Sequence, residues 1–358
     1  MRRNFLLSSI ILFFFGTNCF SQQIIPFNNK HISYEGRILY TPEAAELMWP
    51  GTSVTINFIG TGISGIFKDQ DTSNYYNVVI DKDSIYKIQF DTLKKTVPLA
   101  EGLPYGKHSL QLFKRTEWDK GKTWFYGFVE NSKTKLLDPD KLPKRKIEFF
   151  GNSITCGYAI YDSAQDFPYG YYENNYEAYA AITARHFHAQ YHCTSKSGIG
   201  IMVSWFPLIM PEMYNRLDPT DSTSKWDFSK YTPDLVVINL LQNDSWIVTM
   251  PDNEQFKKRF GSKPPDEAQI VEAYKNFVKT IRSTYPKAQI ICMLGNMDIT
   301  KKSSPWPDYV QKAVDQLHDK KIFTYFVPYK DTYGHPKIKE QKAMANGLIQ
   351  FIDDHIKW

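Results

Sequence analysis

The segment Lys146–Ala159, KIEFFGNSITCGYA, contains the end of one predicted element and the start of another. In its first part, Ile147, Phe149 and Phe150 are apolar and β-favouring, which predicts a buried strand. The strand pattern stops at Gly151, and a helix is predicted to follow. Ser153 therefore carries a small hydroxyl group at the carboxyl end of a buried strand. The role of a hydroxyl at that position depends on which other residues the fold brings to it.

From this segment to the C-terminus, apolar runs alternate with amphipathic helices. Continuous apolar runs are typical of parallel strands that are covered on both faces. The later runs are 233–241 (PDLVVINLL), 288–296 (AQIICMLGN) and 322–329 (IFTYFVPY), and the helix patterns are 174–187, 266–286, 307–321 and 339–356. This alternation predicts a doubly wound α/β domain with α/β/α layers over 146–358.

The part of the chain before this segment has the pattern of a β-protein. In 53–70, SVTINFIGTGISGIFKDQ, apolar residues recur on either side of a Gly-Thr-Gly turn. Further short strands follow, and no helix-length pattern occurs between Gly51 and Asn131. We therefore expect a β-sandwich domain over 27–135. The charged, proline-containing stretch after it predicts a linker at 136–145.

The N-terminus has the features of a targeting segment. Arg2 and Arg3 form a basic start, and a short, mostly apolar run follows at 5–15. We expect a cleaved signal peptide at 1–21 and a secreted or periplasmic protein, with lipoprotein anchoring through Cys19 as the alternative. No later stretch is long and apolar enough to predict a transmembrane segment.

Charge and cysteine content limit the classes of ligand. The formal net charge of +5 is modest for 358 residues, and no block of Lys or Arg indicates nucleic-acid binding. The aromatic content of 15% suits both a β-rich protein and one that stacks sugar rings. After the expected cleavage the cysteines are Cys156, Cys193 and Cys292, whose spacing matches no metal motif. We expect them to be small buried core residues.

Three polar side chains are predicted to meet at one edge of the parallel sheet. Ser153 follows the first strand, Asn243 follows a later one, and His335 follows the last. Ligands of open α/β sheets bind outside the carboxyl ends of the strands, which is where these residues fall. A serine hydroxyl is a weak nucleophile and needs an adjacent imidazole to accept its proton. The three residues thus provide a nucleophile, a donor and a base for acyl transfer.

Acyl transfer also develops an oxyanion, which needs fixed hydrogen-bond donors. The amide of Ser153 at the predicted helix start is one candidate, and the side-chain amide of Asn243 is another. A glycine amide in 196–202, KSGIGIM, is the third candidate, because glycine lets the backbone approach a ligand closely.

The order of these short motifs resembles that of the SGNH (GDSL) hydrolases. GNSIT at 151–155 is similar to their Gly-Asp-Ser-Ile-Thr block, SGIG at 197–200 to their glycine block, QND at 242–244 to their Asn block and HP at 335–336 to their last block. Further stretches resemble carbohydrate esterase family 2, and the resemblance extends over nearly the whole chain after the signal peptide. These are MWPGTSV (48–54), IGTGISG (59–65), KRTE (114–117), MPEMYNRLDP (210–219) and TPDLVVINL (232–240).

This resemblance implies an N-terminal jelly-roll β-sandwich in front of the SGNH domain. Members of the family remove O-acetyl groups from plant polysaccharides such as xylan and glucomannan, without a metal or an organic cofactor. By the family pattern, Ser153 is the nucleophile and His335 the base. Gly198 and Asn243 are the oxyanion donors beside the Ser153 amide. We expect a monomer that binds acetylated polysaccharide or oligosaccharide.

The third catalytic acid departs from the family pattern. SGNH enzymes often have Asp two or three residues before the histidine, where this chain has Tyr333 and Thr332. Asp331 lies one residue further away. Either Asp331 orients the His335 ring or a backbone carbonyl takes the place of the acid. A second departure, Asn152 in place of Asp, removes a charge beside the nucleophile.

Two aromatic residues are candidates for substrate contact, Trp246 just after Asn243 and Tyr158 just after the nucleophile segment. Two other functions remain open. One is an SGNH lipase or thioesterase, which the apolar stretch 198–211, GIGIMVSWFPLIMP, would suit. The other is a carbohydrate-binding protein without catalytic activity, which the missing acid would suit.

Overall fold

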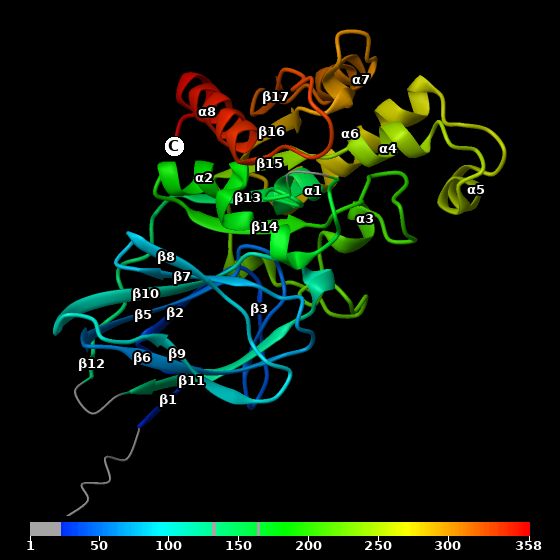
Figure 1. The fold of residues 1–358 in the computed structure, drawn as a ribbon. Coiled ribbons are helices and arrows are strands. Elements are labelled where there is room, and N and C mark those ends of the chain that lie inside the picture. Colours follow the sequence, from blue (N-terminus) through cyan, green and yellow to red (C-terminus); the bar gives the residue numbers. More distant parts are fainter. Residues whose placement is uncertain (1–22, 131–133, 163–164) are drawn as a thin grey trace, which may run out of the picture.

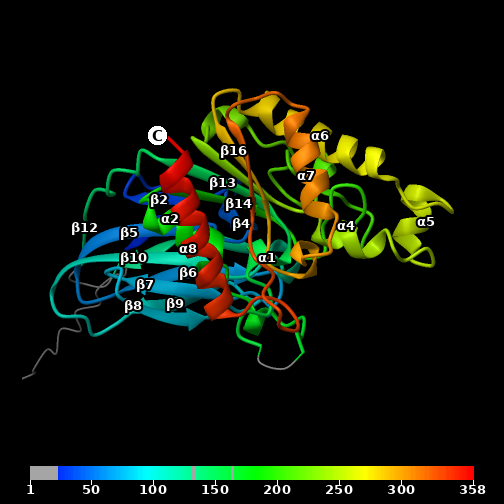
Figure 2. The same cartoon turned by 90° about the horizontal axis from the view of Figure 1, so that it is seen from above.

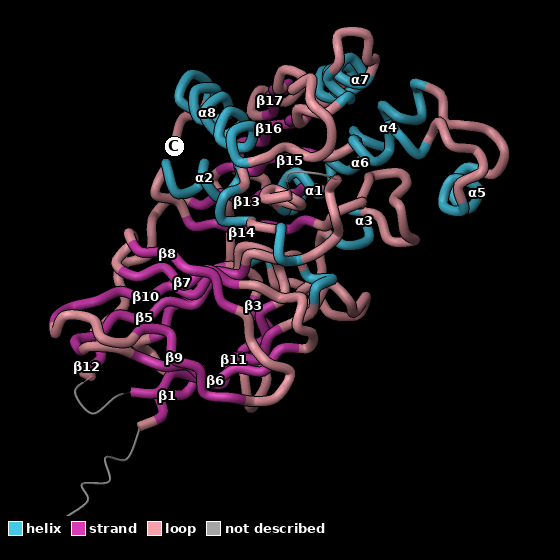
Figure 3. Tube along the Cα trace, in the orientation of Figure 1, coloured by secondary structure: helices cyan, strands magenta, loops and turns pink. Residues whose placement is uncertain are grey.

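The computed structural model describes residues 23–130, 134–162 and 165–358. Two parts with different secondary structure follow each other along the chain (Figure 3). The first consists mainly of strands, and the second alternates between strands and helices from Lys146 onward. Figure 1 shows the two parts packed against each other, with the parallel sheet above the antiparallel ones. The expected signal peptide at 1–21 lies outside the described residues.

The first part is a sandwich of two antiparallel sheets. In strand order, the sheets run β3-β4-β11-β6-β9, with β1 on β11, and β12-β5-β10-β7-β8, with β2 on β5. The first sheet contains β1 (Ile24–Pro26), β3 (Ile38–Tyr40), β4 (Ala45–Leu47), β6 (Ile63–Asp69), β9 (Lys95–Ala100) and β11 (Thr123–Glu130). The second contains β2 (Ile32–Glu35), β5 (Ser53–Gly60), β7 (Tyr76–Ile80), β8 (Ser84–Ile88), β10 (Gly106–Lys114) and β12 (Lys135–Leu136).

The core of the sandwich follows from alternation along its strands. Buried and half-buried residues alternate along β6, so that one face of the strand packs inward. Phe58 and Leu110 of the second sheet meet Phe67 and Phe125 of the first in one apolar cluster. Leu136 of the expected linker pairs with β5, whereas 137–145, which the structure describes throughout, contains no helix or strand.

The second part contains a five-stranded parallel sheet in the order β14-β13-β15-β16-β17. The strands are β13 (Lys146–Gly151), β14 (Gln190–Ser195), β15 (Leu235–Asn239), β16 (Gln289–Leu294) and β17 (Ile322–Phe326). The first strand of the sheet, β13, therefore lies between the second and the third. Such an order reverses direction at the first strand, and ligands of doubly wound folds bind at this switch point.

Helices cover both faces of the parallel sheet (Figure 2). Phe149 of β13 packs in one apolar cluster with residues of α2 (Tyr179–His186) and α8 (Ile338–His355). Its neighbour Phe150 packs in a second cluster with residues of α6 (Glu267–Thr284) and α7 (Trp306–Asp315). Successive side chains of a strand point to opposite faces, which explains why Phe149 and Phe150 are both apolar. The predicted fold class, a β-sandwich followed by a doubly wound α/β domain, is confirmed.

Short helices and 3-10 turns occupy loops in both parts of the chain. They are α1 (Ser153–Cys156), α3 (Met210–Met213), α4 (Gln242–Ile247) and α5 (Glu254–Phe260), with 3-10 turns at η1 (Trp118–Lys120), η2 (Gly170–Tyr172), η3 (Asn175–Glu177), η4 (Phe228–Lys230) and η5 (Asp298–Thr300). The helix after the first strand is a single turn, because Gly157 adopts a left-handed conformation, with φ of +77°, and ends it.

A buried ion pair joins the sandwich to the parallel sheet. Arg37, just before β3, donates to Glu148 Oε1 of β13 at 2.8 Å, and both side chains are almost fully buried. Its other terminal nitrogen donates to the carbonyls of Tyr214 and Arg216 at 2.7 and 2.8 Å. Thr194 Oγ1 also donates to the Glu148 carboxylate. A buried pair whose atoms are hydrogen-bonded in this way fixes the relative placement of the elements that carry it.

Removal of Arg37 should destabilise the protein strongly. Arg37→Ala leaves the Glu148 charge buried without its partner, and we expect the free energy of unfolding to fall by about 3–5 kcal/mol. The control is Lys258→Ala, which breaks the exposed pair of Lys258 with Glu254 on α5 and should leave unfolding unchanged. Urea unfolding followed by circular dichroism measures both. Equal midpoints for the two variants would contradict this role of Arg37.

Candidate active site

The strand-to-helix turn at the end of β13 presents Ser153. Gly151 ends the strand, and a Cβ at this position would lie 2.0 Å from Thr155 Oγ1, so the turn requires glycine. Asn152 Oδ1 accepts a hydrogen bond from the Ile154 amide at 3.1 Å and caps the short helix α1. Asn152, which replaces the usual Asp, thus retains the oxygen that a cap needs. Ser153 is the first residue of α1, at the switch point of the sheet.

The imidazole of His335 meets the hydroxyl of Ser153. His335 lies in the loop between β17 and α8, and its Nε2 is 2.8 Å from Ser153 Oγ. This is hydrogen-bond distance, at which the imidazole can accept the hydroxyl proton. The contact joins residues at the carboxyl ends of the first and last strands of the sheet, as the sequence predicts.

Asp166 holds the other side of the His335 ring. Its Oδ2 lies 2.7 Å from His335 Nδ1 and also accepts the backbone amide of His335 at 2.6 Å. Its Oδ1 accepts from Lys337 Nζ at 2.6 Å, and Lys337 also donates to the carbonyl of Ala159. Burial alone would raise the pKa of Asp166, but the hydrogen bonds from His335 and Lys337 hold it well below its usual value. Asp166 is therefore ionised at neutral pH and fixes the ring with Nδ1 as the donor.

The prediction that Asp331 or a backbone carbonyl orients the His335 ring was wrong. Among the described residues, Asp166 meets His335 Nδ1, and neither Asp331 nor a backbone carbonyl does. The reason is the turn at Gly334, where φ is +73° and a Cβ would lie 2.7 Å from Asp166 Oδ2. This turn brings the ring against the loop that carries Asp166, while Asp331 remains exposed. Sequence reasoning missed Asp166 because it lies 169 residues before His335 and in no recognisable motif.

The three predicted oxyanion donors lie on loops that share hydrogen bonds. Asn243, on α4, accepts from Trp205 Nε1 at 3.0 Å and donates through Nδ2 to the carbonyl of Ile199 at 2.8 Å. These partners fix which side of the amide is the nitrogen, and they leave Nδ2 with a second hydrogen. Gly198 is in the left-handed region, with φ of +81°. The amide of Ser153 opens α1 and has no partner within that helix.

Asp244, the last residue of the QND motif, holds the loop that contains Gly198, which we call the glycine loop. Its buried carboxylate accepts the backbone amides of Ile201, Met202 and Val203 at 2.7 to 3.1 Å. Burial raises the pKa of Asp244 to about 6, and the three amides act in the opposite direction. The pair of Asn243 and Asp244 thus orders the loop that follows β14.

The two predicted substrate-binding residues lie beside His335. The ring of Tyr158 is 4.7 Å from the imidazole, centre to centre, and its hydroxyl donates to the carbonyl of Asp166. Trp246 donates through Nε1 to both carboxylate oxygens of Asp298. Trp246 also lines an open hollow beside His335. The other lining residues are Asp166, Met297, Asp298, Tyr329, Lys330, Asp331, Thr332, Tyr333 and Gly334.

Cysteines and acidic groups in the described part of the chain form no metal centre. Cys156, Cys193 and Cys292 are free and buried, as expected for core residues. No group of three or more His, Cys, Asp and Glu side chains among the described residues is arranged to hold a metal ion. Within the same residues, no helix has the length and apolar character needed to cross a membrane.

A serine, a histidine and an ionised aspartate in hydrogen-bonded sequence, at the switch point of an α/β sheet, define the serine-hydrolase type of site. Comparison with known families agrees. The GDSL-like Lipase/Acylhydrolase family matches residues 149–348, and the Carbohydrate esterase 2 N-terminal family matches residues 34–139. The chain belongs to carbohydrate esterase family 2, which places it among the GDSL-type ester hydrolases.

Several characterised proteins resemble the chain along most of its length. The cellulase/esterase CelE of Acetivibrio thermocellus is 34% identical over 346 residues; these cover 92% of this chain but 40% of CelE. An acetylxylan esterase/glucomannan deacetylase of Cellvibrio japonicus is 25% identical and covers 94% of this chain and 92% of its own. The structure of a family two carbohydrate esterase from Clostridium thermocellum in complex with cellohexaose superposes with a TM-score of 0.80 at 34% identity, covering 90% of this chain and 98% of the other.

Two matched substitutions test which carboxylate orients His335. Asp166→Asn removes the charge that holds the ring tautomer, and we expect turnover of a soluble acetyl ester to fall by ~10²–10⁴-fold. Asp331→Asn leaves the Asp166–His335 contact in place, and we expect a loss of less than ~10-fold. Circular dichroism checks that both variants fold. A larger loss in Asp331→Asn than in Asp166→Asn would overturn the assignment of Asp166.

Proposed function

We propose that this protein is a secreted carbohydrate O-acetyl esterase that acts through an acyl-enzyme on Ser153. The observation that carries the proposal is the 2.8 Å contact between His335 Nε2 and Ser153 Oγ. The ionised Asp166 on the opposite ring nitrogen supports it, because it stabilises the imidazolium that forms when the serine proton is transferred.

In the proposed mechanism, Ser153 Oγ attacks the acetyl carbonyl carbon while His335 Nε2 takes the hydroxyl proton. The carbonyl oxygen becomes an oxyanion, which the amides of Ser153 and Gly198 and the side chain of Asn243 receive. His335 then returns the proton to the sugar oxygen as the carbon–oxygen bond breaks. A water molecule, deprotonated by His335, attacks the acetyl-serine by the same steps and releases acetate. No metal or organic cofactor takes part.

We infer that the substrate is an acetylated polysaccharide or oligosaccharide of plant type, such as xylan or glucomannan. The hollow beside His335 is open, which suits an acetyl group carried on a long chain. Tyr333, which lines this hollow, is 87% exposed, and Trp205, which donates to Asn243, is 44% exposed. Exposed aromatic rings suit stacking on sugars. The names of the similar proteins from Acetivibrio and Cellvibrio support the same substrate class.

The remaining expectations are part of this proposal. Secretion rests on the basic and apolar pattern at 1–21, and we propose that the mature protein acts as a monomer. The contacts among Ser153, His335 and Asp166 give no support to a carbohydrate-binding protein without activity. A lipase or thioesterase is the alternative to be tested with substrates.

The nucleophile is tested by Ser153→Ala. We expect acetate release from acetylated xylan and glucomannan, and hydrolysis of 4-nitrophenyl acetate, to fall by at least ~10³-fold, because loss of a serine nucleophile removes the acyl-enzyme route. The control is Ser283→Ala on the exposed side of α6, which should keep full activity. Unchanged turnover in a folded Ser153→Ala protein would sink the mechanism, and faster hydrolysis of long-chain than of acetyl esters would favour the lipase alternative.

A further inference from the structure

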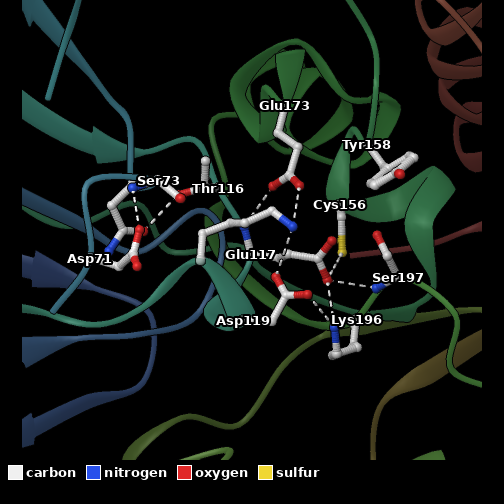
Figure 4. Close-up of polar contacts among 12 residues, drawn as sticks. Asp71, Ser73, Thr116, Glu117, Asp119, Cys156, Tyr158, Glu173, Lys196 and Ser197 are labelled. Atoms are coloured by element: carbon white, nitrogen blue, oxygen red, sulfur yellow. Dashed lines mark hydrogen bonds and ion pairs between the residues drawn. The ribbon is translucent and has the colours of Figure 1, made fainter. Parts of the chain in front are cut away.

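A carboxylate from the sandwich part reaches the loop that carries Gly198. Glu117 lies after β10, at the end of the KRTE segment, and its side chain is fully buried. Its Oε2 accepts the backbone amide of Ser197 at 2.7 Å, lies 3.5 Å from Lys196 Nζ and lies 3.9 Å from Cys156 Sγ (Figure 4). One oxygen therefore contacts the residue before Gly198 and the last residue of the short helix that Ser153 opens.

A buried network of charges holds Glu117 in place. The amide of Glu117 donates to Glu173 Oε2 at 3.1 Å, and Lys120 pairs with Glu173 at 3.3 Å. Lys196 pairs with Asp119 of η1 at 2.7 Å. Burial raises the pKa of Glu173 to about 7, and the charge of Glu117 acts in the same direction. Burial alone would lower the pKa of Lys196, but Glu117 and Asp119 raise it, so the lysine stays charged beside them.

The hydrogen bond to Ser197 acts on the orientation of the next peptide unit. The amide of Gly198 follows that of Ser197, and Gly198 has the left-handed conformation that such a tight turn needs. The side chain of Glu117 is buried, and a hydrogen bond is stronger in such a low-dielectric surrounding than in water. An oxyanion donor acts by being oriented before the reaction, so an anchor one residue away from it bears on the rate.

We propose that Glu117 is a positioning residue for catalysis: the sandwich part, through this carboxylate, sets the Gly198 amide that receives the oxyanion. The inference rests on the proposed esterase function. Glu117 touches neither the nucleophile nor the base among its contacts, so it acts through Ser197 and Gly198. The sandwich part then contributes to catalysis by orienting an oxyanion donor, whether or not it also binds glycan.

Replacement of Glu117 by Gln keeps the size of the side chain and removes its charge. We expect Glu117→Gln to lower kcat on a soluble acetyl ester ~10–100-fold while KM stays within ~3-fold, a partial form of the loss that follows deletion of an oxyanion donor. The matched control is Glu46→Gln. Glu46 is also a buried sandwich carboxylate, but its partners Lys122 and Trp124 both lie in the sandwich part, so kcat should not change.

Inhibition by phenylboronic acid separates positioning from a merely structural role. Ser153 Oγ adds to boron, the hydroxyl proton passes to His335, and a boron-bound oxygen of the tetrahedral adduct occupies the oxyanion position. We expect the inhibition constant of Glu117→Gln to rise by about the factor by which kcat/KM falls. A variant that merely contained less folded protein would lose kcat but would keep the inhibition constant of the wild type.

The outcomes distinguish this inference from the function on which it rests. A wild-type protein without Ser153-dependent ester hydrolysis would overturn the proposed function, and this inference with it. An active esterase in which Glu117→Gln keeps both kcat and the inhibition constant would overturn the role of Glu117 alone. If Glu117→Gln does not fold, Glu117→Asp applies the same test, because its shorter side chain keeps the charge and withdraws it from the Ser197 amide.

Discussion

The central position of β13 in the parallel sheet is the constraint on which the site depends. Because β13 lies between β14 and β15, its carboxyl end opens at the point where the strand order reverses. Ser153 follows this strand directly, the glycine loop follows β14, and Asn243 follows β15. The apolar faces of β13 pack against helices on both sides, so the position of the nucleophile is set by the core of the domain.

Buried carboxylates on both sides of the boundary join the sandwich to the α/β part. Glu148 belongs to the sheet and takes Arg37 from the sandwich part, whereas Glu117 belongs to the sandwich part and takes Ser197 from the loop after β14. Buried charges are costly unless their atoms are hydrogen-bonded, and an alternative packing of the two parts would leave them unpaired. These contacts therefore favour one relative orientation of the two parts, in which Glu117 of the sandwich part contacts the loop that carries Gly198.

The sequence predicts the elements whose signal is local. The apolar runs identify β13, β15, β16 and β17, but not β14, whose sequence QYHCTS is largely polar. The meeting of Ser153 and His335 follows from the rule that ligands bind at the carboxyl edge. Asp166 has no local signal: it lies in a left-handed conformation on an irregular loop, and only the turn at Gly334 brings His335 to it. The contact of Glu117 with Ser197 likewise depends on how the two parts pack together, which a local sequence pattern does not predict.

Covalent capture of the nucleophile tests the central claim most directly. The protein would be treated with diisopropyl fluorophosphate, which phosphorylates a serine only where a neighbouring base activates it, and the modified peptide would be located by mass spectrometry. We expect one label per chain, on Ser153, with loss of ester hydrolysis in proportion to labelling. A label on another residue with full loss of activity, or an active protein that takes up no label, would contradict the account.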